Sequence, residues 1–255
     1  MPGPVFTGVG VALVTLFDDR GELDAPASGR LAAQLVEAGM QAVVVAGSTG
    51  EAATLEREER IRLLDAVRDA LGGAAPVIAG TGAPSARQAV ALTRDAVEHG
   101  ADAVLVLSPP RSIDLAGYYG AVAGVGGVPV LGYHFPAVSA PGIPVEALAT
   151  LPISGLKDSS GEPARLLAEL AVLPRGGALY TGSSSILSFA GPAGCTGAIL
   201  SLANVEPERC IEAFAGDAAA QRALYEGHVA AHDRFPQGLK ELVAKRFGTG
   251  TTCRL

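Results

Sequence analysis

The chain has 255 residues, of which 49% are hydrophobic and 18% charged, so it can bury the core of one large α/β domain. A formal net charge of -7 and a pI near 5.1 leave no basic surface for nucleic acid. No apolar run approaches the roughly 18 residues that cross a bilayer, and the first ten residues lack a charged segment and a cleavage site, so we expect a cytoplasmic protein without a membrane partner.

Eight short apolar runs rich in Val, Ile and Leu recur along the chain. The first few follow one another about every 25 to 35 residues, the size of a strand with its crossover helix, and segments with apolar residues at helical spacing separate most of them. Near-continuous apolar strands that alternate with helices predict a parallel sheet covered on its outside, here a closed (β/α)8 barrel. The runs are Val9–Leu16, Ala42–Val45, Pro76–Ala79, Ala103–Leu107, Val128–Tyr133, Ile153–Leu156, Ala178–Thr181 and Gly197–Ser201.

After Ser201 the pattern changes to helices alone. Residues 206–215, 218–231 and 238–246 each carry an apolar face, and no strand signal follows. The sequence therefore predicts a (β/α)8 TIM barrel over residues 1–205 and a short C-terminal helical extension over residues 206–255 that packs on the barrel.

Active sites of such barrels lie at the C-terminal ends of the strands, so the polar residues that follow each apolar run are the candidates. After the fourth run comes Ser108-Pro109-Pro110-Arg111, and Tyr133-His134-Phe135-Pro136 closes the fifth. The remaining three candidates are Gly47-Ser48-Thr49-Gly50-Glu51, Lys157-Asp158-Ser159-Ser160-Gly161 and Thr181-Gly182-Ser183-Ser184-Ser185.

Lys157 is the candidate nucleophile. Only three of the 19 basic residues are lysines, so a lysine in mid-chain calls for chemistry that arginine cannot perform. Burial at the barrel mouth can lower a lysine pKa from about 10.4 to roughly 7 to 8, where free amine attacks a ketone. The alternative is a lysine that extends from a strand end into solvent, which its scarcity and small neighbours disfavour.

Two further strand ends suit the same reaction. Tyr133 ends the strand expected about 5 Å from that of Lys157, so its phenol could relay protons, although it could also only seal the barrel rim. Ser48 and Thr49 lie between two glycines, where backbone amides and hydroxyls can bind an oxyanion; an ordinary Gly-rich turn is the alternative. Thr54 is a plausible cap for the next helix, whose dipole would favour a carboxylate.

Three other signals predict no cofactor site. Gly8-Val9-Gly10 and Gly80-Thr81-Gly82 lack the third glycine of a dinucleotide fingerprint. His228 and His232 are spaced as a metal pair on a predicted helix, but without a third ligand a solvated helix face is expected. The three cysteines, which form neither a disulfide framework nor a zinc motif, are Cys195, Cys210 and Cys253.

The strand-end motifs together resemble a known family, the dihydrodipicolinate synthase and N-acetylneuraminate lyase superfamily. The resemblance covers about residues 5–205 and implies a TIM barrel. Its motifs, in order, are TLFDDRGELD (15–24), GSTGE (47–51), YHFP (133–136), GLKDSSG (155–161), TGSSS (181–185) and GAILSLANV (197–205).

The resemblance implies a role for each candidate. Lys157 forms an imine with pyruvate, Tyr133 moves protons, and Ser48 and Thr49 hold the carboxylate, with Thr49 counted among the catalytic residues. Because the imine is itself the electron sink, no metal or organic cofactor is expected. A homodimer or homotetramer is expected. The residues that the resemblance also places around bound pyruvate are Gly182 and Ile199.

Three departures from the family pattern bear on the second substrate. Arg111 and Ser112 stand where the family has loop tyrosines, and Val138 stands where true dihydrodipicolinate synthases read a substrate carboxylate with arginine. The helical tail is also shorter than is usual. We count Val138 and Arg111 as candidate substrate-binding residues.

The leading hypothesis is a pyruvate-dependent class I aldolase or lyase acting on a 2-oxo-3-deoxy or 4-hydroxy-2-oxo acid, with pyruvate and an aldehyde as its small-molecule partners. The nearest alternative is dihydrodipicolinate synthase, which Val138 disfavours. The alternative from another class is a pyruvate-binding barrel with impaired catalysis, which intact Lys157 and Tyr133 disfavour.

Overall fold

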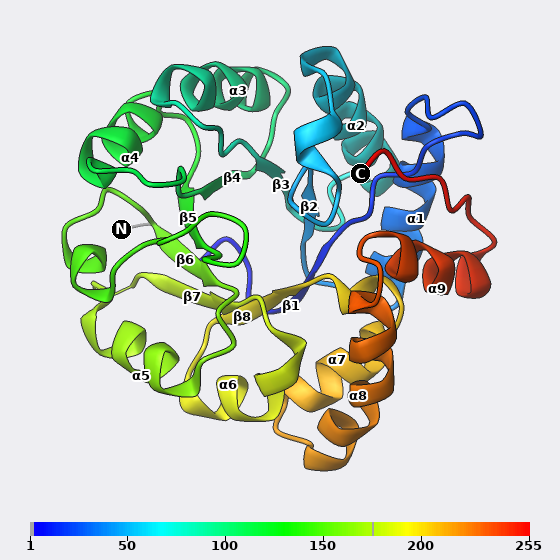
Figure 1. Ribbon diagram of the computed structural model, residues 1–255. Coiled ribbons are helices and arrows are strands. Elements are labelled where there is room, and N and C mark those ends of the chain that lie inside the picture. Colours follow the sequence, from blue (N-terminus) through cyan, green and yellow to red (C-terminus); the bar gives the residue numbers. More distant parts are fainter. Residues whose placement is uncertain (1–2, 175) are drawn as a thin grey trace.

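Eight parallel strands close into a barrel in which each strand pairs with its sequence neighbours and β8 pairs with β1 (Figure 1). This computed structural model describes residues 3–174 and 176–255. The strands are β1 (Gly8–Ala12), β2 (Val43–Val45), β3 (Val77–Gly80), β4 (Ala103–Leu107), β5 (Val130–His134), β6 (Gly155–Asp158), β7 (Ala178–Thr181) and β8 (Gly197–Leu200).

Helices cover the outside of the barrel, which explains why the strands are apolar on both faces. A short 3-10 helix, Val145–Ala149, stands after β5, and others are Ala52–Thr54, Ser184–Ile186 and Leu202–Asn204. The α-helices are α1 (Ala25–Glu37), α2 (Arg57–Leu71), α3 (Ala86–Glu98), α4 (Leu115–Ala123), α5 (Pro163–Val172), α6 (Leu187–Ala193), α7 (Pro207–Phe214), α8 (Ala218–His232) and α9 (Gln237–Phe247).

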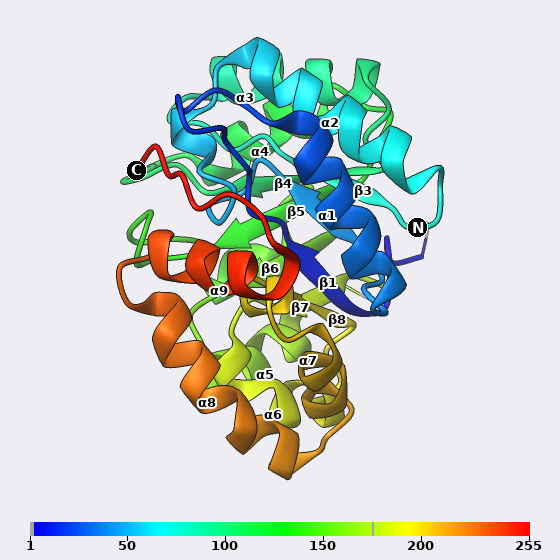
Figure 2. The same ribbon diagram turned by 90° about the vertical axis from the view of Figure 1, so that its right-hand side faces the viewer.

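The predicted TIM barrel is confirmed, and so are the three helices after β8. α7 is the outer helix that follows β8 and completes the eighth strand–helix unit. α8 and α9 are additional helices that follow it (Figure 2). Whether residues 206–255 form a unit of their own remains a prediction. Among the described residues, no helix is both long and apolar enough to cross a membrane.

Two local predictions are wrong. The first apolar run predicts a strand to Leu16, but β1 ends at Ala12, because Val14 N–H bonds the side chain of Asn204 and the Thr15 hydroxyl bonds Gly50 O. Thr54 does not cap α2, since its hydroxyl donates to Glu51 O. A capping box between Glu56 and Glu59 begins that helix instead.

The barrel interior is packed and supports the site from below. Phe6, which precedes β1, lies in the interior cluster and stacks on Tyr180 with ring centres 4.6 Å apart. The Tyr180 hydroxyl donates to Phe6 O at 2.9 Å. Ile199 is fully buried in the same cluster, so little space is left beneath the C-terminal strand ends.

Candidate active site

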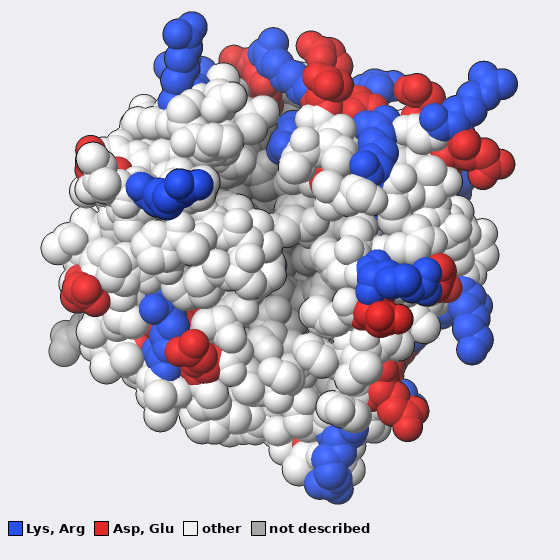
Figure 3. Space-filling view, viewed as in Figure 1, with Lys and Arg blue, Asp and Glu red and all other residues white. Residues whose placement is uncertain are grey.

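A cavity of about 1210 Å³ opens at the C-terminal ends of the strands. Figure 3 shows the hollow at the centre of this face, with mostly uncharged residues around it. The structure brings together six of the predicted site residues around it, namely Lys157, Tyr133, Ser48, Thr49, Gly182 and Val138.

Lys157 lies on β6, in register with Tyr133 of β5. Its side chain is buried, with Nζ 4.4 Å from the centre of the Tyr133 ring. No hydrogen bond to Nζ is found within the described residues. Burial without a partner disfavours the ammonium form and lowers the pKa of Lys157 to about 7. Free amine is therefore available at neutral pH, as a nucleophile requires.

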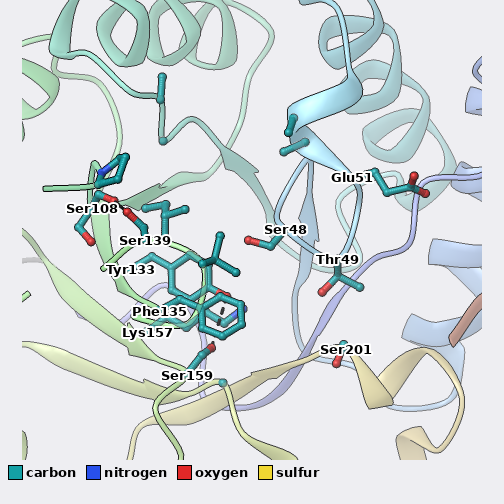
Figure 4. Close-up of a pocket in the computed structure, with 18 of the residues that line it drawn as sticks. Ser48, Thr49, Glu51, Ser108, Tyr133, Phe135, Ser139, Lys157, Ser159 and Ser201 are labelled. Atoms are coloured by element: carbon teal, nitrogen blue, oxygen red, sulfur yellow. Dashed lines mark hydrogen bonds between the residues drawn. The ribbon is translucent and has the colours of Figure 1, made fainter. Parts of the chain in front are cut away.

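The Tyr133 hydroxyl lies within a group of other hydroxyls. Ser159 Oγ donates to it at 3.3 Å, and the dashed line in Figure 4 marks this bond. Burial raises the pKa of Tyr133 to about 12, although its hydrogen bonds with Ser159 and Ser48 oppose that shift. A phenol that stays protonated near neutral pH and contacts two hydroxyls can pass protons between them.

Ser159 is a residue of this group to which the sequence analysis assigned no role. Ser159 directly follows β6, two residues beyond Lys157, and both residues line the cavity. Ser159 Oγ and Lys157 Cε both lie close to Gly182. Any side chain at position 182 would place its Cβ only 2.8 Å from Lys157 Cε. A glycine at 182 is therefore required for the lysine to occupy its position. The signal in the sequence that could have identified Ser159 is its spacing from Lys157, Lys-x-Ser, at the end of a predicted strand.

Residues 47–51, here called the 47–51 turn, follow β2 and hold Ser48 and Thr49. Ala46 and Glu51 on either side adopt left-handed backbone conformations with φ of 51° and 54°. These conformations cost non-glycine residues free energy and persist only where contacts hold them. Figure 4 shows the Ser48 hydroxyl pointing toward Tyr133, while Glu51 points away.

The other predicted binding residues lie at differing depths. Ile199 is buried in the barrel interior and does not line the cavity. Arg111 is exposed, has a φ of 54° and donates its backbone N–H to Ala140 O, but its side chain does not line the cavity either. Val138 does line the cavity and is 57% exposed. Substrate contacts by Arg111 and Ile199 remain predictions.

The histidine pair of α8 lines the cavity, with His228 partly buried and His232 exposed, so the expected solvated position holds for His232 and only in part for His228. His228 Nδ1 lies 2.8 Å from Ser184 Oγ, and its ring centre is 4.3 Å from that of His232. Burial and, secondly, the charge of His232 lower the pKa of His228. In the described part of the chain, no three His, Cys, Asp or Glu side chains are grouped to hold a metal.

Replacing Lys157 with Met should raise the free energy of unfolding at pH 7 by about 1–3 kcal/mol. The folded-state pKa of Lys157 lies below the unfolded value of about 10.5, so between these pH values the unfolded chain binds more protons. The free energy of unfolding of the wild type should rise with pH across that window. The difference in this quantity between the wild type and the Met variant should therefore shrink. Urea unfolding of both proteins at pH 7 and pH 10 measures this; equal stability at pH 7 would contradict a costly burial.

The fold and this cavity define a class of protein, a (β/α)8 barrel with a buried lysine amine at its mouth. Residues 5–253 match the Dihydrodipicolinate synthetase family, and the chain belongs to that family. The predicted family and enzyme class are thereby confirmed, and the chain is a carbon–carbon lyase.

Its relatives cover most of the chain. It is 38% identical over 226 residues to a 4-hydroxy-tetrahydrodipicolinate synthase of Methylococcus capsulatus, covering 84% of this chain and 78% of the relative. The enzyme of the same name from Pseudomonas aeruginosa is 36% identical, covering 86% and 80%. A dihydrodipicolinate synthase of Acinetobacter baumannii, solved with pyruvate, has a TM-score of 0.91 at 28% identity, covering 99% of this chain and 92% of its own.

Proposed function

We propose that this lyase forms an imine between Lys157 and pyruvate and makes or breaks a carbon–carbon bond at the pyruvate methyl carbon. The observation that carries the proposal is the buried lysine with a pKa of about 7 at the mouth of the barrel. The Acinetobacter baumannii relative binds pyruvate in the same fold, which supports pyruvate as the substrate.

The proposed steps use only side chains of the cavity. Ser48 and Thr49 hold the carboxylate while Lys157 Nζ attacks the ketone carbon, whose oxygen leaves as water. Loss of a methyl proton then gives an enamine, and its carbon attacks the aldehyde carbon. The aldehyde oxygen takes up a proton, and water hydrolyses the imine to free product and lysine. Tyr133, in contact with the Ser159 hydroxyl, carries these protons.

The wall that would face the aldehyde is rich in neutral hydrogen-bonding groups. Ser183, Ser184 and Ser185 after β7 line it together with His228, while Val138 adds an apolar surface. Because the pKa of His228 is lowered, its imidazole is neutral near pH 7. Such groups suit the hydroxyls of an uncharged aldehyde, so we propose a 2-oxo-3-deoxy or 4-hydroxy-2-oxo acid as the aldol substrate.

Condensation of pyruvate with aspartate semialdehyde is the second candidate. The names of the relatives favour it, since two at 36–38% identity are 4-hydroxy-tetrahydrodipicolinate synthases. Val138 argues against it, because a valine offers no guanidinium fork to a substrate carboxylate. A pyruvate-binding barrel without turnover is disfavoured by the complete group of Lys157, Tyr133 and Ser159.

Turnover of neutral hydroxyaldehydes should exceed that of aspartate semialdehyde. The missing fork is worth roughly 1.5–3 kcal/mol, or about ten- to a hundredfold in kcat/KM. Coupled assays should compare both aldehydes, and cleavage of several 2-oxo acids, at equal enzyme concentration. Val138→Arg should shift the ratio toward aspartate semialdehyde, and Arg111→Ala, assayed alongside, tests whether Arg111 supplies the charge for the substrate carboxylate from another direction. A wild-type kcat/KM for aspartate semialdehyde above every aldol substrate would instead establish the second candidate.

Three accompanying proposals follow from the family. The imine replaces any metal or organic cofactor, the protein is a homodimer or homotetramer, and it is located in the cytoplasm. Light scattering at micromolar concentration addresses the second, since a 25.6 kDa particle would contradict it.

A further inference from the structure

Glu51 is a buried carboxylate within the 47–51 turn. Its side chain is 0% exposed, and Figure 4 shows it directed away from the cavity. Three donors reach it: the Lys240 ammonium at Oε1, and at Oε2 the backbone N–H groups of Arg254 (2.7 Å) and Leu255 (3.0 Å). All three donors come from α9 or the residues that follow it, so the C-terminal part of the chain reaches the back of the turn.

Lys240 is as deeply buried as its partner. Its side chain is 0% exposed, and Nζ also donates to Thr252 O at 2.7 Å. Two cations approach the ring of Phe17, with Lys240 Nζ 4.5 Å and Arg254 Cζ 4.3 Å from its centre. The buried Lys240–Glu51 ion pair and these added contacts fix the position of the Glu51 side chain, because either partner left alone would be a desolvated charge.

Arg254 extends the contact along the loop to α2. Its guanidinium holds both carboxylate oxygens of Glu59 at 2.7 Å, donates to Thr54 O at 3.1 Å and to Gly21 O at 2.6 Å. Figures 1 and 2 both show this red segment running beside the loop after β1 and toward the start of α2. Arg254 thus contacts residues on both sides of the 3-10 helix 52–54, Glu51 through its backbone N–H and Glu59 through its side chain.

The turn itself depends on these contacts for its shape. Glu51 adopts the left-handed conformation, and its N–H donates to Ser48 O at 3.2 Å. A displaced Glu51 would therefore shift the Ser48 backbone. Thr15 supports the turn independently, donating from Oγ1 to Gly50 O at 2.7 Å. Loss of the Glu51 contacts should therefore leave the turn formed and displace its hydroxyls and amides.

We propose that Lys240 and residues 252–255 form a clasp on Glu51 that positions the 47–51 turn and so sets the affinity for the substrate carboxylate without touching it. This inference rests on the proposed function, because it takes Ser48 and Thr49 as the carboxylate-binding residues. Arg254 is thereby a positioning residue for pyruvate binding.

The test compares Arg254→Ala with Arg246→Ala in the complete chain. Arg246 pairs with Glu208 through two hydrogen bonds of 2.6 and 3.1 Å, on an exposed surface of α9 away from the turn, which makes it a matched control. Borohydride trapping of the lysine adduct is measured against pyruvate concentration. In Arg254→Ala the half-saturating concentration should rise about tenfold, with the yield at saturation within about twofold of wild type. The control should change neither quantity.

A thermal unfolding curve for each variant separates positioning from plain stability. Lower stability with an unchanged half-saturating concentration would overturn the clasp and leave the proposed function standing. If Arg254→Ala does not fold, Arg254→Lys decides, since it keeps the charge but loses the fork to Glu59. We expect an intermediate half-saturating concentration, and the wild-type value would overturn the inference. Absence of a wild-type adduct would overturn the proposed function itself, and the clasp with it.

Discussion

Pyruvate and borohydride together should label the protein irreversibly at Lys157, and Lys157→Ala should take no label. Only an imine there can be reduced to a stable secondary amine, and its formation needs the free amine that a pKa of about 7 supplies. The rate should rise with pH through about 7 and then level off, because deprotonation of Lys157 is then complete. Mass spectrometry of peptides identifies the labelled residue.

The chain provides its own control for this experiment. Lys240 is also fully buried, but its Nζ is hydrogen-bonded to Glu51 and to Thr252 O and the residue does not line the cavity, so it should not meet pyruvate. An adduct on Lys240 or on Lys245, or none at all, would contradict the mechanism. Lys157→Arg should be as inactive as Lys157→Ala, since a guanidinium stays protonated and is no nucleophile.

Tyr133→Phe should lower kcat by about 10²- to 10⁴-fold, the range for loss of a general acid or base. In the proposed mechanism the phenol carries protons after pyruvate has bound, so the half-saturating pyruvate concentration should change much less. Steady-state assays on the best aldol substrate measure both quantities. The phenylalanine keeps the stacking on Phe135, whose ring centre is 5.7 Å from that of Tyr133, so the fold should tolerate the change.

Ser159→Ala tests whether proton transfer by Tyr133 needs the hydroxyl of Ser159. It removes the hydroxyl that donates to Tyr133 at 3.3 Å and leaves the phenol in place, so kcat should fall by about tenfold. If Tyr133→Phe retained most of the wild-type kcat, Tyr133 would have no role in proton transfer. A Ser159→Ala loss as large as that of Tyr133→Phe would place the serine, rather than the tyrosine, at the reacting atoms.

The strands and the strand-end site were predictable because they depend on local patterns. Apolar runs at β-α spacing lead to a parallel barrel, whose C-terminal strand ends must converge. Tyr133 and Lys157 close neighbouring runs, and the structure places them in register. Ser159 followed from the same alternation but was not assigned, because serines abound at these strand ends.

The scarcity of lysine was a weaker guide than it first suggested. Two of the three lysines, Lys157 and Lys240, are buried, and only their surroundings separate a nucleophile from an ion pair. Lys157 has an aromatic ring beside it, whereas Lys240 meets the carboxylate of Glu51 from 189 positions away. Sequence spacing cannot show which distant charge a lysine will meet.

The sequence by itself determined the barrel, the order of its strands and the lysine, tyrosine and Ser-Thr turn at their ends, because periodicity and turn chemistry act over a few residues. Only the tertiary structure decided the pKa of Lys157, the contacts of His228 with Ser184, and the clasp of residues 252–255 on Glu51. These depend on burial and on contacts between distant segments, where the free energy of a charge is set by neighbours that the chain order does not reveal.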